Sequence, residues 1–322
     1  MSRIRVGVMR GGAGHEYDVS LKTGANVLKY ISKEKYEPID VLITKDGTLH
    51  VNGFPISLEK LAKNIDVVFN ALHGEFGEDG KVQQLLGDFS IPHTGSKAFA
   101  SAVGMNKALA KEYFKNAGIK TPYHEVIKKG DDVLHSALEI FRKIPPPYIV
   151  KPLSSGSSIG LSLTRTFDGL MSAIEYALTY SPAVLVEEYI KGKEVSCGVI
   201  DSLEHDGAHP THPVEIILPP GARVFNYSLK YGDAAKKSCP AEISETEKEI
   251  LQALAVRAHR GIGMRHYSVS DFIVSPRGIF LLEVNSLPGL TDKSLLPYAL
   301  QASDLSLEEF LDHVLTLALN RK

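Results

Sequence analysis

The stretch KPLSSGSSIG at residues 151–160 decides how this sequence can fold. It follows apolar residues that begin at Tyr148, so Lys151 stands at the end of an expected strand and a Gly/Ser loop comes directly after it. The backbone N–H groups of such a loop can converge on phosphate oxygens, and the lysine adds a positive charge. The pattern differs from a P-loop, which needs GK[ST] at the start of a helix. A flexible surface turn is the alternative interpretation.

The stretch LEVN, which ends at Asn285, predicts a strand with two different faces. Because side chains alternate along a strand, we expect Glu283 and Asn285 to point the same way. Leu282 and Val284 should then point into the core. Asp271 lies on the neighbouring expected strand, and two carboxylates with an amide oxygen are ligands that suit Mg²⁺ bound together with phosphates. An exposed sheet face is the alternative.

Two further stretches are weaker indications of binding sites. EEYI at residues 187–190 precedes a hinge that can offer backbone groups to an adenine edge, and Glu194 can offer a carboxylate to ribose hydroxyls. A solvated acidic turn is the alternative there. HGEFGEDG at residues 73–80 places glycines and carboxylates at a strand end, which suits a substrate loop. Its alternative is a turn before a helix capped by Asp79, with His73 in a structural role.

The residues on either side of these stretches predict the domain pattern. Strands alternate with helices over about the first 95 residues, which is typical of a parallel, doubly wound sheet. The ligands of such sheets gather at the carboxyl ends of strands, where Gly11-Gly12 and His73-Gly74 are expected. The expected elements of this part are strands at Ile4–Met9, Ile39–Thr44 and Ile65–Leu72 and a helix at Val19–Ile31.

The later elements are less regular. Residues 218–242 are polar and aromatic with little periodicity, so we expect a long loop of the kind that often covers an active site. Ser244 and Glu247 fit a capping box at the start of a helix. The other expected elements are a helix-rich segment at 97–119, strands at Tyr148–Lys151, Val184–Glu188 and Glu194–Ile200, a hairpin of Ser268–Val274 with Gly278–Val284, and a closing helix at Leu305–Leu319.

The composition excludes several classes of protein. The 322 residues predict two or three domains. A hydrophobic share of 43% is enough for a large core, and a net charge of −2 does not favour binding to nucleic acid or to an anionic membrane. The sequence has no apolar run long enough to span a bilayer and no signal-peptide pattern at the start. Cys197 and Cys239 do not form a CxxC pair. A cytoplasmic location is the simplest expectation.

In this order the motifs resemble those of the ATP-grasp enzymes, and specifically the D-alanine–D-alanine ligase family. The resemblance covers essentially the whole chain, and it implies an α/β fold of three domains at residues 1–96, 97–185 and 186–322, the first with a doubly wound parallel sheet. It also implies that a loop at about 218–242 covers the site. The resemblance rests on Glu16 with residues 19–21, HGEFGEDG at 73–80, MNK at 105–107, KPLSSGSSIG at 151–160, EEYIKGKEV at 187–195, Lys230-Tyr231 and EVNSLPGLTDKSLLP at 283–297.

The resemblance also implies a reaction and its partners. The carboxylate of one D-alanine attacks the γ-phosphate of ATP, and the amine of a second D-alanine attacks the resulting acyl phosphate. The dipeptide serves peptidoglycan synthesis, and a homodimer is expected. For the cofactors, the resemblance assigns the phosphates of ATP to Lys107 and Lys151, the adenine pocket to Glu187 and Ile190, the ribose to Glu194, and two Mg²⁺ ions, or Mn²⁺, to Asp271, Glu283 and Asn285.

Further residues match the substrate contacts of the family. Tyr231 also favours a dipeptide product, since relatives that use D-lactate usually change this residue. The resemblance assigns the first D-alanine to Glu16 and His73, the bonds between that glutamate and the covering loop to Ser157 and Tyr231, the second D-alanine to Lys230 and Ser294, and the oxyanion to the N–H of Gly289.

One departure from the family pattern bears on activity. The family has Arg-x-Asp where this chain has Val269-Ser270-Asp271. Val269 shares a strand face with Asp271, so we expect its side chain to point toward the metal and phosphate site, where the guanidinium is missing. Three hypotheses follow: the chain binds ATP with little turnover, a nearby cation such as Arg265 substitutes, or the enzyme takes a different D-amino acid. Gln84, at a usual glycine, is a second departure that affects packing.

Overall fold

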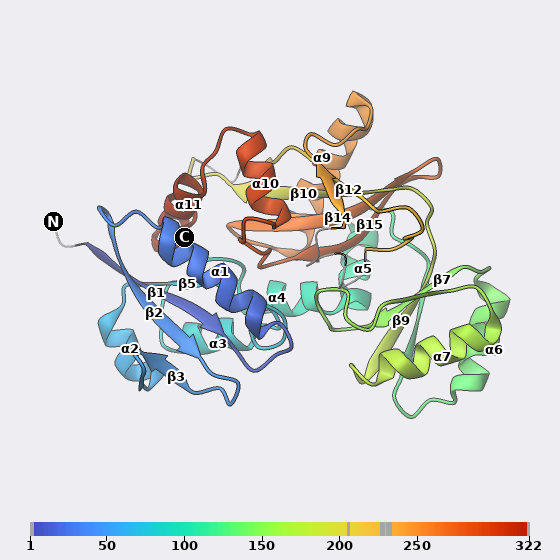
Figure 1. Cartoon of the computed structure of the whole chain (residues 1–322), viewed down its shortest axis with the longest axis horizontal. Coiled ribbons are helices and arrows are strands. Elements are labelled where there is room, and N and C mark those ends of the chain that lie inside the picture. Colours follow the sequence, from blue (N-terminus) through green and yellow to red (C-terminus); the bar gives the residue numbers. More distant parts are fainter. Residues whose placement is uncertain (1–2, 205–206, 226–228, 230–233, 321–322) are drawn as a thin grey trace.

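The computed structural model describes residues 3–204, 207–225, 229 and 234–320, and it contains three sheets (Figure 1). The first sheet has the strand order β4-β3-β2-β1-β5, in which β1 pairs in parallel with β2 on one side and β5 on the other. The expected parallel strands are confirmed, and the antiparallel hairpin β3–β4, which we did not predict, extends the sheet. Its elements are β1 (Ile4–Gly11), α1 (Tyr17–Tyr30), β2 (Tyr36–Ile43), β3 (Leu49–Val51), β4 (Phe54–Pro55), α2 (Leu58–Asn64), β5 (Val67–Asn70) and α3 (Lys81–Asp88).

The strand order reverses at β1, and this reversal sets the place of the site. The chain passes from β1 to β2 on one side and later returns from β4 to β5 on the other side of β1, so a crevice is expected beyond the carboxyl ends of β1 and β5. Gly12 follows the first of these ends and His73 follows the second. The expected substrate loop at 73–80 therefore lies at the switch point of the sheet.

The second sheet is antiparallel, with the order β6-β9-β7-β8. Tyr148 and Val150 of β7 point into a core with the apolar faces of α6 and α7. Ile149 and Lys151 alternate with them and face a cavity on the other side. The elements of this part are β6 (His124–Lys128), α6 (Val133–Lys143), β7 (Tyr148–Pro152), β8 (Ser162–Thr164), α7 (Phe167–Leu178) and β9 (Ala183–Glu188).

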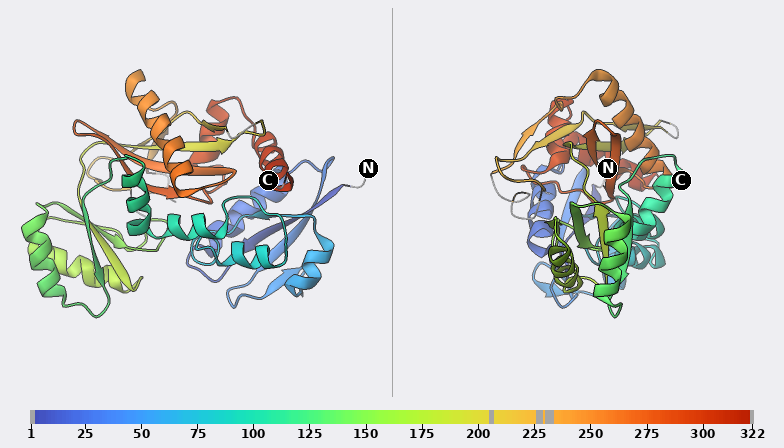
Figure 2. Two further views of the ribbon diagram at one scale, coloured as in Figure 1. Left: turned by 180° about the vertical axis from the view of Figure 1, so that it is seen from behind. Right: turned by 90° about the vertical axis from the view of Figure 1, so that its right-hand side faces the viewer.

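The third sheet has the order β13-β12-β10-β14-β15, and β11 also pairs with β10. It lies above the other two in Figure 1, and the view from behind in Figure 2 shows α4 and α5 running between them. The capping box at Ser244 is confirmed. The elements are α4 (Ala98–Met105), α5 (Lys107–Asn116), β10 (Lys193–Asp201), β11 (Ala208–Pro210), β12 (Val214–Ile217), β13 (Lys236–Ser238), α9 (Glu245–Ile262), β14 (Tyr267–Ser275), β15 (Gly278–Asn285), α10 (Leu295–Ala302) and α11 (Leu307–Leu319).

A β-bulge changes the expected orientation of one residue in β15. Asp271 pairs with Glu283, but the next residue, Phe272, pairs with Leu281, so Leu282 is the extra residue. Leu281 enters the core and Leu282 lines a cavity instead. The expectation that Leu282 points into the core was therefore wrong, because simple alternation does not hold across a bulge.

Two expected segments differ in detail. The helix-rich segment at 97–119 is two helices, because Asn106 leaves the helical conformation and caps α5 by accepting the N–H of Leu109. The expected loop at 218–242 contains the short strand β13. Residue 185, the expected domain boundary, lies within β9, and the division into three domains stays a prediction.

No helix among the described residues is long and apolar enough to cross a membrane.

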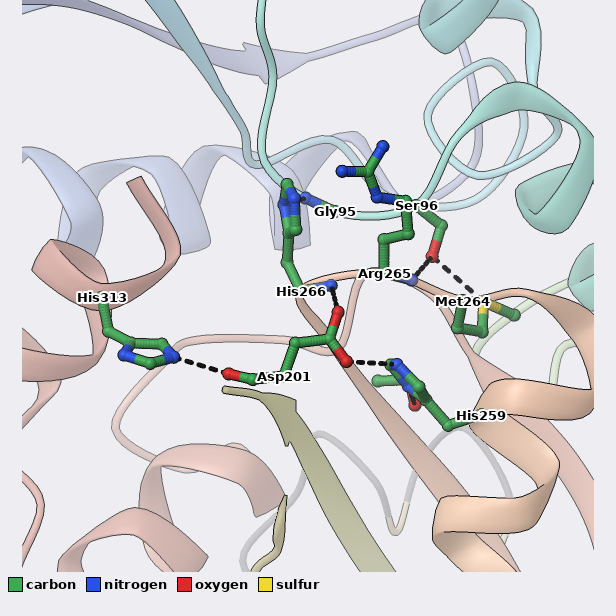
Figure 3. Close-up of polar contacts among 9 residues, drawn as sticks. Gly95, Ser96, Asp201, His259, Met264, Arg265, His266 and His313 are labelled. Carbon is green, nitrogen blue, oxygen red and sulfur yellow. Dashed lines mark hydrogen bonds and ion pairs between the residues drawn. The ribbon is translucent and has the colours of Figure 1, made fainter. Parts of the chain in front are cut away.

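Asp201, at the end of β10, is the centre of a polar network that joins the third sheet to the segment after β5 (Figure 3). Its carboxylate accepts hydrogen bonds from His259 Nε2, at 3.0 Å, and from the backbone N–H of His266. The Nδ1 atom of His266 in turn accepts the backbone N–H of Gly95 at 3.1 Å. A ring nitrogen that accepts a backbone N–H carries no proton, so His266 is neutral in this arrangement.

The neutral state of His266 predicts a pH dependence of stability. Burial, followed by the charge of Arg265, lowers the pKa of His266 from 6.5 to about 3. The unfolded chain therefore binds this proton at a higher pH than the folded protein does. The free energy of unfolding should fall as the pH drops from 6.5 toward 3, with a contribution of about 1.4 kcal/mol per pH unit from this group.

His266→Asn should flatten that part of the pH dependence, because asparagine does not titrate and tolerates the left-handed backbone at this position. Denaturant unfolding at pH 7 and pH 5 measures the difference for each protein. His135→Asn, at an exposed position on α6, is the control and should keep the wild-type slope. Equal slopes for wild type and His266→Asn would contradict the prediction.

Candidate active site

Two cavities meet between the three sheets. The larger, of about 640 Å³, lies among the first sheet, α1 and the segment that follows β15. The smaller, of about 330 Å³, lies between the second and third sheets. Phe225, Asp271 and Leu295 line both cavities, so a group transferred from one cavity to the other would pass Asp271.

Glu16 ties the first sheet to the Gly/Ser loop. Ser157 Oγ donates a short hydrogen bond to Glu16 Oε1, although 141 residues separate them in sequence. A Cβ atom at Gly74 would lie 2.4 Å from Glu16 Oε2, and one at Gly156 would lie 2.3 Å from it. Only glycine leaves room for the carboxylate at both positions. We associated Gly156 with the phosphates, but it lines the larger cavity beside Glu16.

The loop at 73–80, which we expected to bind substrate, is held by hydrogen bonds on both sides. His73 Nε2 lies 2.8 Å from Thr23 Oγ1 of α1, and the imidazole lines the larger cavity. Glu78 accepts the N–H of Gly74 at 2.9 Å and the N–H of Leu287 at 3.0 Å. The carboxylate of Glu78 thus connects the first sheet with the segment after β15. Asp79 is not the N-cap of α3, which is Gly80.

The opposite end of the larger cavity is formed by the turn before α10. Ser294 Oγ accepts the N–H of Thr291 at 3.1 Å, and Ser294 is the N-cap residue of this helix. A Cβ atom at Gly289 would lie 2.8 Å from Ser294 Oγ. Close packing of backbone against this hydroxyl explains the glycine, and both residues line the cavity.

The smaller cavity contains the lysines of the phosphate motif. Lys107 Nζ donates to the carbonyl of Ser155 at 2.7 Å and lies 3.3 Å from Glu283 Oε2. Lys107 therefore joins α5 to the Gly/Ser loop and to β15. The other residues of this cavity that we predicted are Lys151, Glu187, Ile190 and Glu194.

Glu187 carries a buried pair of ion contacts. Lys111 Nζ lies 2.7 Å from its Oε1 and Lys151 Nζ lies 2.8 Å from its Oε2. Burial alone would raise the pKa of Glu187, but the two ammonium groups outweigh that effect and lower its pKa to about 2. Glu187 lines the cavity as expected, yet its carboxylate oxygens contact lysines.

The expected metal ligands come together where the two cavities meet. Asp271 and Glu283 are paired across β14 and β15, and the Asn285 amide donates to Asp271 Oδ2 at 3.0 Å. Ser196 Oγ of β10 donates to Asp271 Oδ1 at 2.5 Å. Two carboxylates and an amide are a donor set that could hold Mg²⁺ beside phosphates. The described residues contain no group of three or more His, Cys, Asp or Glu placed to hold a metal by themselves.

Val269 points into the larger cavity, as expected from its position two residues before Asp271. It is 4% exposed and packs with Leu287, Leu290 and Leu296. Arg265 lines neither cavity in the described chain, and in Figure 3 its guanidinium extends beside residues 95–96. The lining of the two cavities therefore gives no support to the hypothesis that Arg265 substitutes for the missing arginine, and it stays a hypothesis.

Gln84 donates to Asp88 along α3 and lines neither of these two cavities. Lys230 and Tyr231 lie outside the described residues. The sequence did not predict the roles of four residues in or beside the site, which are Glu78, Lys111, Ser196 and Lys237. Of these, Lys111 could have been found, because its spacing from Lys107 places both on one helix face.

A Gly/Ser loop of one antiparallel sheet that covers carboxylates of another is the arrangement of the ATP-grasp class of enzymes. Two family patterns match this chain: the D-ala D-ala ligase N-terminus over residues 50–96 and the D-ala D-ala ligase C-terminus over residues 113–316. The chain belongs to the D-alanine–D-alanine ligase family.

Individual relatives agree over the whole length. The chain is 36% identical to the D-alanine–D-alanine ligase of Syntrophobacter fumaroxidans, with 98% of each chain covered. It is 37% identical to that of Geobacter sulfurreducens, with 99% of this chain and 95% of the relative covered. The VanG D-Ala:D-Ser ligase from Enterococcus faecalis has a similar structure, with a TM-score of 0.86, 28% identity and coverage of 98% and 100%. The D-alanine–D-alanine ligase from Bacillus anthracis complexed with ATP gives a TM-score of 0.80 at 28% identity, with coverage of 98% and 97%.

The hydrogen bond from Ser196 predicts an effect on metal binding. Ser196→Ala removes a donor that orients Asp271, and loss of such an outer contact typically weakens metal affinity by about 10–100-fold. Mn²⁺ titration in the presence of ATP, followed by electron paramagnetic resonance of the free ion, measures the change. Ser202→Ala, just beyond the same strand and outside both cavities, is the control. Equal Mn²⁺ affinity in the two variants would refute the role of Ser196.

Proposed function

We propose that this protein joins two D-alanine molecules in an ATP-dependent reaction that yields D-alanyl-D-alanine, ADP and phosphate. The observation that carries the proposal is the junction of two cavities at Asp271, one lined by Lys107 and Lys151 and the other by Glu16 and His73. Membership of the family supplies the identity of the substrates. The dipeptide then serves peptidoglycan precursor synthesis.

ATP binds in the smaller cavity. Its phosphates lie toward Lys107 and Lys151, whose ammonium groups are held in place by contacts with Ser155 and Glu187. The adenine lies beside Ile190, and the ribose hydroxyls lie toward Glu194. Both residues line this cavity, which supports the assignment.

Mg²⁺, in two ions, would be held by Asp271, Glu283 and Asn285, and Mn²⁺ would fit the same oxygen donors. When bound, the metal neutralises charge on the transferring phosphoryl group. The chemistry of the donor set and the position of Asp271 between the two cavities support this assignment. Ser196 keeps the Asp271 carboxylate in one orientation.

In the first step, a carboxylate oxygen of one D-alanine attacks the γ-phosphorus of ATP. The bond from that phosphorus to its bridging oxygen breaks, and ADP leaves with the electron pair. Lys107 and Lys151 stabilise the negative charge that spreads over the phosphoryl oxygens. Glu16 and His73 hold this first D-alanine, since both line the larger cavity and Glu16 can receive its ammonium group.

In the second step, the neutral amine of another D-alanine attacks the acyl carbon and forms the C–N bond of a tetrahedral intermediate. The bond from that carbon to the phosphate oxygen then breaks, and phosphate leaves with the electron pair and takes up the proton that the amine loses. The N–H of Gly289 stabilises the oxyanion, and Ser294 binds the second substrate. Ser157 donates a hydrogen bond to Glu16, and both residues line the larger cavity. Lys230 is assigned to the second D-alanine, and Tyr231 to the hydrogen bonds with Glu16 that fasten the loop at 218–242 over the site. Both assignments rest on resemblance alone and stay predictions.

The valine at position 269 favours a low rate of turnover. The cavity wall at this position is a valine packed on three leucines, where the family has a guanidinium. Loss of one donor to a developing charge typically costs about 10²–10³ in rate. A homologue that binds ATP without turnover is the second candidate, and Val269 is the observation that favours it. A ligase for another D-amino acid is the third, favoured by the structural likeness to a D-Ala:D-Ser ligase.

Purified protein should release ADP and phosphate from Mg-ATP only when D-alanine is present. A coupled ADP assay with tens of millimolar D-alanine or D-serine, combined with chromatography of the dipeptide, distinguishes the three candidates. Product from D-alanine alone supports the proposal. ATP binding without release of phosphate would refute it in favour of the homologue without turnover.

Val269→Arg should raise kcat by about tenfold or more, because it restores a cation beside the transferring phosphate. Val269→Met is the matched control, since it changes size without charge. The two variants are compared by initial rates and by thermal unfolding, which checks that the core tolerates each change. A rate no higher than that of Val269→Met would show that this position does not limit turnover.

The remaining assignments rest on the family and on the kind of substrate. We infer a cytoplasmic location, where ATP is available. The homodimer and the absence of nucleic-acid and membrane partners stay predictions. Sedimentation of the purified protein tests the first of them.

A further inference from the structure

Lys111 is a buried lysine that the mechanism above does not use. It lies on α5, its side chain is 0% exposed, and it lines neither of the two cavities. Burial of an ammonium group is costly unless a counter-charge compensates. Glu187 Oε1, at 2.7 Å, supplies that charge.

The arrangement around Glu187 is a line of alternating charges. Lys111 contacts one carboxylate oxygen, and Lys151 contacts the other at 2.8 Å. Lys151 belongs to β7 and lines the smaller cavity, whereas Lys111 belongs to α5 and contacts Glu187 without lining that cavity. With both lysines protonated, the three groups together carry one net positive charge, and Lys151 is the lysine that can present it to a ligand.

We propose that Lys111 is a positioning residue that makes Lys151 available to the phosphates of the nucleotide. By occupying Oε1, Lys111 limits Lys151 to a single oxygen of Glu187. It also neutralises the carboxylate, so that the charge of Lys151 is directed to the cavity. This inference rests on the proposed function, because it concerns the nucleotide site of that reaction.

The charge balance predicts what happens without Lys111. The remaining pair, Glu187 and Lys151, would be neutral, and both carboxylate oxygens would compete with phosphate for the same ammonium group. In a buried site such competition is strong, since water screens little of it. Removal of the Glu187 charge as well would free Lys151 again.

Lys111→Met should therefore weaken the binding of Mg-ATP by about tenfold or more, the equivalent of losing one charged contact. Calorimetry without D-alanine measures this directly, so the result does not depend on ligation. Lys115→Met is the matched control, because Lys115 lies one turn further along α5 and pairs with Glu112 at the exposed surface. It should bind Mg-ATP as the wild type does.

A double variant separates positioning from packing. Lys111→Met combined with Glu187→Gln should bind Mg-ATP more tightly than Lys111→Met alone, since Lys151 is released. A role in packing alone would make the double variant equal or worse. In active protein, the KM for ATP should rise in Lys111→Met while the KM for D-alanine stays within about twofold, less than the change a single charged contact makes.

Three results would overturn the inference: unchanged Mg-ATP affinity in Lys111→Met, no recovery in the double variant, or no binding of Mg-ATP by the wild type. Wild-type binding without ligation would instead refute the proposed function and leave the test of Lys111 intact. Thermal unfolding identifies any variant that fails to fold. If Lys111→Met does not fold, the double variant, which keeps the net charge of the wild-type cluster, decides whether the inference holds.

Discussion

The pairing of β14 with β15 is the constraint on which the site depends. It sets Asp271 opposite Glu283, and the bulge directly after this pair turns Leu282 toward the smaller cavity while Leu281 stays in the core. Because Asp271 also lines the larger cavity, one strand register connects the two binding regions. A shift by one residue would exchange cavity and core faces and separate the carboxylates.

The second requirement is that three separate sheets meet around these strands. Glu16 is the N-cap residue of α1, next to the first sheet, and Ser157 lies in the loop between β7 and β8 of the second, and their hydrogen bond joins these parts beside the larger cavity. Lys107 makes the corresponding connection between α5, the Gly/Ser loop and Glu283. The polar groups of the site therefore serve as joints between parts of the chain that have separate cores.

Much of this could be predicted from the sequence, because strand alternation and capping are local. The hairpin of β14 and β15, the capping box at Ser244 and the faces of Val269 and Asp271 followed from spacing alone. The bulge at Leu282 could not be predicted, since it depends on how one strand pairs with another. The contacts of Lys111 and Ser196 were missed for a similar reason: their partners lie 75 or more residues away. Arg265 shows the same limit of local reasoning, because its nearness to Val269 in sequence does not place it in the lining of either cavity.

The last helix has a consequence for how the chain reaches this state. Phe310, Leu311 and Val314 of α11 share a core with Val6 and Val8 of β1. During synthesis the first sheet therefore leaves the ribosome long before the helix that covers one of its faces. That face stays without this cover until residues 307–319 have been made. The core of the first sheet therefore gains α11 only after the strands of the other two sheets have been synthesised.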